Sequence, residues 1–356
     1  MKTAVVSTYC EWNSFGSVLQ AIGLQQILKD IGVDSTVIRL RESKDIKPVK
    51  YRKGLNLRSF AVNAEIFLNK NKTVQAHRKN VAFINKHVKV KTYSDYHALK
   101  GNPPEADVYI AGSDQIWHPK IKREDFYLNY APEQKRCVVY AASMGVTELS
   151  AEEEGGFCRN LKKFSSLSVR EAEMIPVIQR VADKPIYTHI DPVFLRGVDE
   201  WRTLQKPYGL KVPYILVYPI YWDKKYNKKL KELKRRTGLP IISIHTGLRN
   251  VFADKVIRDA DVGEFLWLVD HAQYVITSSF HGVAFSILFN KPFCAVVNPK
   301  SPSRINNLLK LLGIKPLNIQ LESADDEVDY NEVNKRIREE RERSVDYLRR
   351  EIFSEE

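Results

Sequence analysis

The chain has 356 residues, 44% of them hydrophobic and 28% charged, which is typical of a globular protein with room for about two domains. It lacks an apolar run of about 18 residues, which excludes a membrane-spanning helix, and its first residues lack the apolar region of a signal peptide. We therefore expect a cytoplasmic protein. The four cysteines form no C-x-x-C pair, so neither a disulfide framework nor a metal site is predicted. Cys10 follows the first predicted strand and could be exposed.

The net charge of +13 is concentrated in one segment. Residues 39–91 contain 15 Lys and Arg against 3 Asp and Glu, which gives +12. Such a segment indicates an anionic partner, such as a phosphorylated ligand or an acidic membrane surface, although a solvated loop is the simpler alternative. No nucleic-acid-binding motif is present, and we expect no nucleic-acid partner. Residues 55–68 are largely apolar. Two interpretations are equally well supported: the segment lies near an anionic bilayer, or it forms a helix that packs on the first domain.

Strands alternate with helices along most of the chain. In the first part, apolar strands are predicted at residues 3–8, 34–40, 106–112, 137–142, 166–170 and 185–190. Helices are predicted at 17–32 and from 150 to about 164, the second opened by the capping box SAEE, with a further helix between the last two strands. Continuous apolar strands separated by helices indicate a parallel sheet that is buried on both faces.

A second set of the same kind follows residues 201–213, which we interpret as a linker. Its strands are predicted at 214–220, 239–245, 274–278 and 292–297, and its helices at 224–236, near 263–271 and at 282–290. The sequence thus predicts an α/β protein with mainly parallel sheets. Its parts are a first domain at 1–200 that carries the basic insertion, a second domain at 201–329, and a charged C-terminal helix at 330–356.

Ligands of open α/β sheets bind where strands end, so polar residues just after strands are the candidates for a site. These are Asn13, Ser17, Ser113, Asp114, Gln115, Arg170, Ser279, His281, Lys300 and Arg304. Each also has a structural interpretation as a turn, a cap or an ion pair. For Arg170 the structural partner would be Glu171 or Glu173. His281 is expected in the first turn of its helix, facing the cleft, where a helix cap and a proton donor are about equally supported.

Several segments together are similar to one known family. They are NSFGSVLQA, DVYIAGSDQIWHP, VVYAASMG, LSVRE, DPVFL, YVITSSFHGVAFSILFNKPF and SRINNLLKLLG, in this order. The chain resembles the polysaccharide pyruvyl transferase family over nearly its whole length. That resemblance implies two Rossmann-like domains arranged as in B-type glycosyltransferases. It also implies transfer of pyruvate from phosphoenolpyruvate to two hydroxyls of a sugar, giving a cyclic ketal in a polysaccharide or its lipid-linked precursor.

On this resemblance the candidates take roles. His281 would protonate the methylene carbon of phosphoenolpyruvate, and Asp114 would orient or deprotonate an acceptor hydroxyl. Donor contacts would come from Arg170, Lys300, Arg304 and Ser279, and acceptor contacts from Asn13, Ser17, Ser113 and Gln115. No metal or organic cofactor is expected. The donor would lie on the second domain and the acceptor on the first.

One position departs from the family pattern. Many members carry Arg two residues before the histidine, where this chain has Ser279. Another cation must then hold the donor here, or the donor differs. Two other functions stay open: a glycosyltransferase of the same fold that uses a nucleotide sugar, and a glycan- or membrane-binding module without activity.

Overall fold

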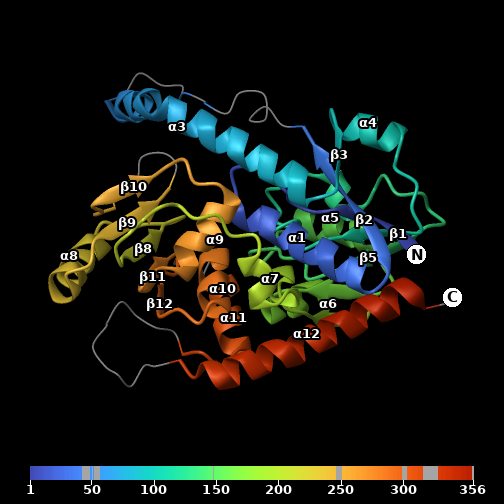
Figure 1. The fold of residues 1–356 in the computed structure, drawn as a ribbon. Helices are drawn as coiled ribbons and strands as arrows, with labels where there is room; N and C mark the ends of the chain where they lie inside the picture. The colour runs from blue at the N-terminus through green and yellow to red at the C-terminus, as the bar shows by residue number, and fades with distance from the viewer. Residues whose placement is uncertain are drawn as a thin grey trace.

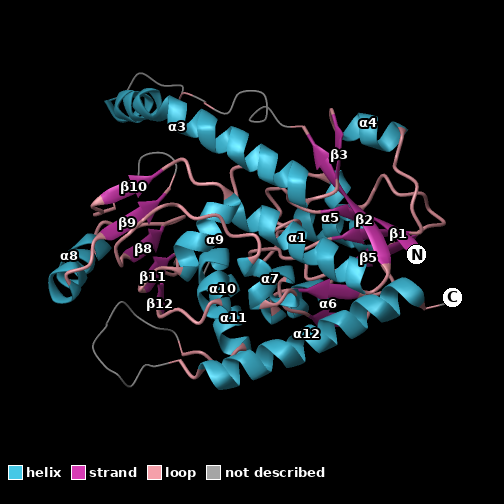
Figure 2. Cartoon of the chain, viewed as in Figure 1, coloured by secondary structure: helices cyan, strands magenta, loops and turns pink. Residues whose placement is uncertain are grey.

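Two five-stranded parallel sheets form the centre of the molecule (Figures 1 and 2). The computed structural model describes residues 1–41, 49, 51, 57–146, 148–245, 251–298, 303–315 and 328–354. The first sheet has the order β3-β2-β1-β4-β5. Its strands are β1 (Lys2–Ser7), β2 (Val33–Leu40), β3 (Val90–Tyr93), β4 (Val108–Ala111) and β5 (Arg136–Val139). Two shorter strands, β6 (Leu167–Val169) and β7 (Ile186–Thr188), pair with each other and join this sheet through parallel bridges at Ala142.

The second sheet repeats the topology of the first. Its order is β10-β9-β8-β11-β12. The strands are β8 (Ile215–Tyr218), β9 (Ile241–Ile244), β10 (Lys255–Ile257), β11 (Tyr274–Thr277) and β12 (Phe293–Ala295). In both sheets the first strand in sequence is central, and every pair is parallel. The predicted α/β class with two parallel sheets is therefore confirmed.

Helices cover both sheets (Figure 2). They are α1 (Phe15–Asp30), α4 (Tyr96–Gly101), α5 (Ala151–Leu161), α6 (Ile175–Gln179), α7 (Val198–Arg202), α8 (Tyr226–Thr237), α9 (Val262–Asp270), α10 (Phe280–Leu288) and α11 (Ser303–Leu311), with 3₁₀ turns at Glu124–Tyr127, Ala172–Met174 and Pro192–Leu195. Residues 16–24 of α1 are all buried, because this helix contacts the turn at Pro192–Leu195 and also α9 and α10 of the second domain. Helix α1 therefore lies at the junction of the domains.

The segment predicted as a linker is anchored at its start, and most of its later residues are exposed. It begins inside α7, where Trp201 is fully buried and its indole N–H donates to the carbonyl of Val193 at 2.9 Å. The Trp201 ring also meets Phe285 of α10 edge-on, with 5.3 Å between centroids. A hydrogen bond from the amide of Lys206 to the carbonyl of Gly263 continues this contact. The start of the connection between the domains is thus anchored in the core.

The basic segment contains one long helix, α3 (Leu57–His87), which crosses the top of the molecule in Figure 1. Its second half is packed: Ala76 and Ile84 are buried, Asn80 accepts the amide of Val262, and Lys79 pairs with Glu264 of α9 at 2.6 Å. These two polar contacts are with the second domain and lie beyond residues 55–68, so they do not decide between a place near a bilayer and a helix packed on the first domain there. Residues 42–48, 50 and 52–56 of the segment lie outside the described residues.

The predicted C-terminal helix is α12 (Tyr330–Phe353), which runs beneath both domains (Figure 1). At its start, the Tyr330 hydroxyl donates to the carbonyl of Lys291 in the second domain at 2.6 Å. Near its end, the hydroxyl of Tyr347 donates to the carbonyl of Val139 in β5 at 2.9 Å. The helix therefore ties the second domain to the first. Within the described part of the chain, no helix is both long and apolar enough to cross a membrane.

The structure corrects the expectation for Cys10. Its side chain is 3% exposed, and burial raises the pKa of its thiol to about 12. Because only the thiolate is a good nucleophile, Cys10 is a buried structural residue.

We predict that His189 makes the native state sensitive to acid. Its ring lies 4.4 Å from that of Tyr347, and burial, followed by the charges of Arg343 and Arg350, lowers its pKa to about 4. The usual value is 6.5, so between these two values the unfolded chain binds the additional proton. Stability should fall by up to about 3 kcal/mol as the pH drops through this range.

Urea unfolding across this pH range measures the effect. His189→Gln should lose this part of the pH dependence, and the exposed His271 changed to Gln should keep it. An unchanged slope in His189→Gln would assign the acid sensitivity to other groups.

Candidate active site

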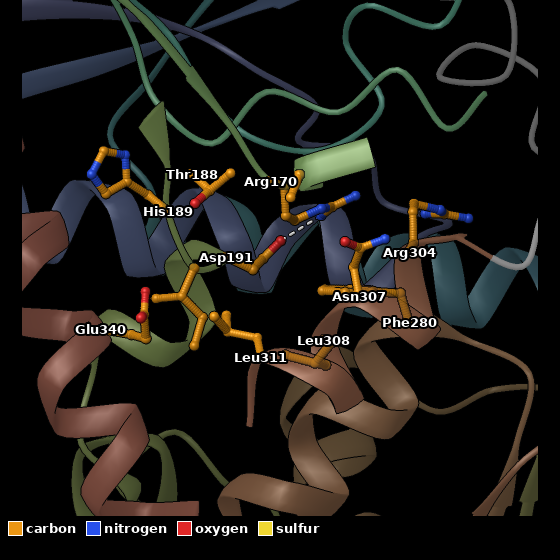
Figure 3. Close-up of a pocket in the computed structure, with 12 residues that line it drawn as sticks. Arg170, Thr188, His189, Asp191, Phe280, Arg304, Asn307, Leu308, Leu311 and Glu340 are labelled. Atoms are coloured by element: carbon orange, nitrogen blue, oxygen red, sulfur yellow. Dashed lines mark hydrogen bonds and ion pairs between the residues drawn. The ribbon is translucent and has the colours of Figure 1, made fainter. Parts of the chain in front are cut away.

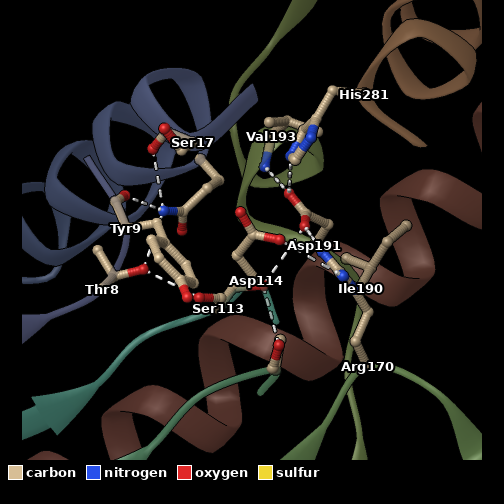
Figure 4. A network of polar contacts seen from close by, with 12 residues as sticks. Thr8, Tyr9, Ser17, Ser113, Asp114, Arg170, Ile190, Asp191, Val193 and His281 are labelled. Carbon is tan, nitrogen blue, oxygen red and sulfur yellow. Dashed lines mark hydrogen bonds and ion pairs between the residues drawn. The ribbon is translucent and has the colours of Figure 1, made fainter. Parts of the chain in front are cut away.

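Arg170 is the centre of a buried group of charges between the domains (Figure 4). It directly follows β6, and its guanidinium contacts Asp191 Oδ2 through Nη1 at 2.5 Å and Glu171 Oε1 through Nε at 3.1 Å. Its Nη2 lies 3.9 Å from Asp114 Oδ1, and its guanidinium carbon lies 4.3 Å from the ring centroid of Phe280. Although burial lowers the pKa of Arg170, the three carboxylates raise it by more. Arg170 is thus held in its charged form by first-domain carboxylates and covered by α10 of the second domain.

Asp191 was not assigned a role from the sequence, yet it contacts three of the predicted residues. Its Oδ2 binds Arg170 and accepts from Ser113 Oγ at 3.3 Å. Its Oδ1 accepts the amide of Val193 at 3.1 Å and lies 3.8 Å from His281 Nε2, an ion-pair distance. Burial opposes ionisation, but His281, Arg170 and the Val193 amide together lower the pKa of Asp191 well below its usual value. Asp191 directly follows the predicted strand at 185–190, and this position is the sequence feature that could have identified it as a site residue.

His281 lies against the opposite domain. It is the second residue of α10, it is 7% exposed, and its ring packs on Gly16 of α1, where a Cβ atom would come within 2.0 Å of Nδ1. The N-cap is Ser279, whose hydroxyl accepts the amide of Gly282 at 3.3 Å. The helix cap considered for His281 is therefore made by Ser279. His281 Nε2 is buried and makes no hydrogen bond to any residue in the described ranges.

The loops after β4 and β5 have unusual backbone geometry. Asp114 has a φ of 74° and Ala141 a φ of 48°, both in the left-handed region that favours glycine. Ser113 Oγ donates to the carbonyl of Ala141 at 2.8 Å, which joins the two loops. Such conformations persist where surrounding contacts impose them, often at functional sites. Here they place the Asp114 carboxylate beside Arg170.

A first cavity, with about 450 Å³ of empty space, opens beside these charges (Figure 3). Arg170 and Asp191 line it from the first domain, and Phe280 and Arg304 from the second. Arg304 is the second residue of α11, and its Nε is buried without a hydrogen-bond partner among the described residues. Burial and then the charge of Arg170 lower the pKa of Arg304, although it stays a strong base. Two arginines at one cavity favour an anionic ligand. Lys300, the third predicted donor cation, lies outside the described residues.

A second cavity of about 740 Å³ contains Ser17, Asp114 and Gln115, together with His118 and Lys120. Three of the predicted residues therefore meet here. The hydroxyl of Ser17, however, is used within its own helix end, because it donates to the carbonyl of Ser14 and accepts the amide of Glu11, both at 3.0 Å. Asp114 and Gln115 are the members whose side chains suit a hydroxylated ligand.

Asn13 lies in a third cavity, of about 580 Å³, and so does not join the other predicted acceptor residues. Trp12, Phe15 and Tyr218 give this cavity aromatic walls, and it lies at the carboxyl ends of β8, β9 and β10. Helix α3 contributes Ala76 and Asn80 to its lining. Nothing in the sequence pattern linked the basic insertion to a cavity. Among the described residues, no group of three or more His, Cys, Asp or Glu side chains is placed to hold a metal ion.

Comparisons with known proteins give a family and a fold. The family described as polysaccharide pyruvyl transferase matches residues 15–301. No curated protein matches the sequence.

Among solved structures, the S. aureus MnaA–UDP co-structure aligns with 11% identity and a TM-score of 0.52, covering 98% of this chain and 96% of that one. A putative UDP-N-acetylglucosamine 2-epimerase from Listeria monocytogenes aligns with 12% identity and a TM-score of 0.52, covering 100% and 98%. The UDP-GlcNAc 2-epimerase from Neisseria meningitidis, bound to UDP-GlcNAc, has 9% identity, a TM-score of 0.51 and coverage of 100% and 95%. At these identities the likeness shows the two-domain fold alone.

We predict that the two arginines of the first cavity have opposite effects on stability. Arg170→Met leaves Asp191 and Glu171 buried without their cation, which should cost about 3–5 kcal/mol. Arg304→Met removes a half-buried guanidinium whose buried Nε has no hydrogen-bond partner in the described residues, so stability should stay unchanged or rise. Urea unfolding of both variants measures the difference. Equal destabilisation would show that Arg304 is also held by carboxylates.

Proposed function

Because the chain belongs to the polysaccharide pyruvyl transferase family, we propose that it transfers pyruvate from phosphoenolpyruvate to two hydroxyls of a sugar, forming a cyclic ketal. The acceptor would be a polysaccharide repeat or its lipid-linked precursor, and the reaction would take place in the cytoplasm. The observation that carries this proposal is the pair Arg170 and Arg304 at one buried cavity between the domains. A small ligand with a phosphate and a carboxylate suits two such cations.

Phosphoenolpyruvate would bind in the first cavity. Arg304 is the main cation for its phosphate, because the charge of Arg170 is already compensated by Asp191 and Glu171. Arg170 would contribute its Nη2, which is buried without a hydrogen bond to any described residue. This arrangement also suggests which cation replaces the arginine that many family members carry at position 279. Ser279, the N-cap of α10, is neutral, but the guanidinium of Arg170 lies over the ring of the next residue, Phe280. In this proposal Ser279 contributes to donor binding by capping the N-terminus of α10, and it contributes no charge.

His281 would supply the proton that starts the reaction. It does not itself line the first cavity, but its Nε2 lies 3.8 Å from Asp191, which does. Its transfer from Nε2 to the methylene carbon gives a methyl group and leaves a cationic C2. The first sugar hydroxyl attacks C2 and loses its proton, the bond from C2 to the phosphate oxygen breaks, and the second hydroxyl closes the ketal. Of the two hydroxyl protons, one balances the proton on the new methyl group and the other leaves on inorganic phosphate. The Asp191 carboxylate lies 3.8 Å from Nε2 on the side of the first domain.

The acceptor would approach through the second cavity. Asp114 lies 3.9 Å from Arg170 and also lines this cavity, so its carboxylate connects the two ligands. Because Asp114 would lie beside both the donor and the acceptor, it is our candidate for the base that takes the proton of an acceptor hydroxyl. Gln115 would hold a neighbouring hydroxyl, while Ser113, which is fully buried, supports the loop from behind. No step in this scheme needs a metal or an organic cofactor.

Ligand-dependent thermal stability tests the donor. Phosphoenolpyruvate should raise the melting temperature, since a ligand at 100 times its Kd stabilises the fold by about 2.7 kcal/mol. Arg304→Met should lose this shift while keeping its own stability. A shift with UDP-sugars or GDP-sugars but not with phosphoenolpyruvate would overturn the proposal in favour of a nucleotide-sugar glycosyltransferase. A shift with none of them would favour a binding module.

The proton donor is tested by His281→Gln. Glutamine keeps a hydrogen-bonding side chain but cannot deliver a proton near neutral pH, so turnover should fall by about 10²–10⁴ while donor affinity stays within a few fold. Phosphate release with a competent acceptor gives the rate, and a melting curve gives the folded fraction. His271→Gln, at an exposed histidine of the same domain, is the matched control. If folded His281→Gln turned over at nearly the rate of the unmodified protein, His281 would not be the proton donor. Its role would then be structural, as the side chain that packs against Gly16.

A further inference from the structure

Three large apolar side chains lie exposed on the first half of α3. Phe60 is 76% exposed, Phe67 67% and Leu68 79%. Their spacing of seven and eight residues places them on one face of the helix, and the exposed Ala64 lies between them. Single exposed apolar residues are common on proteins, but three within about two turns form a patch. We call Phe60, Ala64, Phe67 and Leu68 the outer face of α3.

The orientation of this half-helix is fixed from the opposite side. Glu65 forms an ion pair with Arg258, which follows β10 and also donates to the carbonyl of His245 at 3.2 Å. Ser59 is buried on the same side. Because this inner side is attached to the second domain, the helix cannot turn its apolar residues inward without breaking these contacts. The outer face is therefore presented to solvent by the fold.

Exposed basic side chains follow the outer face along α3. Lys70 and Lys72 are exposed in the next turn, and Arg78 is exposed two turns further on. In the sequence, Lys50, Arg52, Lys53 and Arg58 precede the face, and Glu65 is the only acidic residue between 46 and 91. A second copy of this chain would bring the same excess of positive charge, whereas an anionic lipid surface would neutralise it. Apolar side chains beside lysines and arginines are the pattern of interfacial helices.

We propose that the outer face of α3 docks this protein on an anionic bilayer, with Phe60, Phe67 and Leu68 entering the interface and the flanking basic residues contacting lipid headgroups. The same helix lines the third cavity with Ala76 and Asn80. From Leu68 to Ala76 the helix rises about 12 Å. The docked face is thus close to a cavity between the domains. On the proposed function, the sugar of a lipid-linked acceptor would pass from this third cavity to the second cavity, because Trp12 and Asn13 of the third are chain neighbours of Glu11 and Ser14 of the second.

Sedimentation of the full chain with lipid vesicles tests the proposal without donor or acceptor, so its result does not depend on the proposed activity. The protein should bind vesicles that contain phosphatidylglycerol at low salt, and bind weakly to phosphatidylcholine alone. Phe60→Gln/Phe67→Gln/Leu68→Gln should lower the partition coefficient at least tenfold, since each side chain loses its place in the interface. Lys70→Gln/Lys72→Gln should lower it by roughly tenfold or more, and high salt should act in the same direction.

The matched control is Val212→Gln/Phe353→Gln, which removes exposed apolar side chains far from α3 in the sequence and should bind like the unmodified protein. Melting curves show that each variant is folded. Absence of binding at low salt, or equal binding of the triple variant and the unmodified chain, would overturn the proposal. So would a dimer in sedimentation velocity that the triple variant abolishes while vesicle binding stays unchanged, because the face would then contact a second copy.

Discussion

The buried charge of Arg170 is the constraint on which the rest of the site depends. A guanidinium between two domains is costly unless it is paired, and Asp191 and Glu171 pair with it directly. This pairing fixes the carboxyl end of β6 and the turn at Pro192–Leu195, against which α1 packs. It also leaves Arg304 as a half-buried cation whose Nε makes no hydrogen bond within the described ranges. The site thus contains one structural arginine and one that is available to a ligand.

The two domains meet through small, close contacts rather than through a free hinge. Gly16 permits the His281 ring to lie directly on α1, and Trp201 fills the core beneath α10. Helix α12 adds hydrogen bonds at both ends. These contacts hold His281 of one domain at 3.8 Å from Asp191 of the other, a geometry on which the proposed reaction depends. Such precision is what general acid catalysis requires.

The basic insertion has a dual structural role. Its second half completes the junction of the domains and lines a cavity there, and its first half carries an exposed apolar face among positive charges. A single continuous helix therefore connects the cleft region to the outer surface. The exposed apolar face and the lining of a cavity between the domains thus belong to one rigid element.

The sequence by itself determined the alternation of strands and helices, the two parallel sheets, the long C-terminal helix and the family, because hydrophobic periodicity and local motifs are properties of neighbouring residues. It also selected Arg170, Asp114, His281 and Arg304, since polar residues after buried strands are visible along the chain. Only the tertiary structure decided that Asp191 connects them, that Asn13 lies in a separate cavity, and that Cys10 and Trp201 are buried. These outcomes depend on contacts between residues far apart in sequence, such as His281 on Gly16, and no local pattern encodes which distant surfaces will meet.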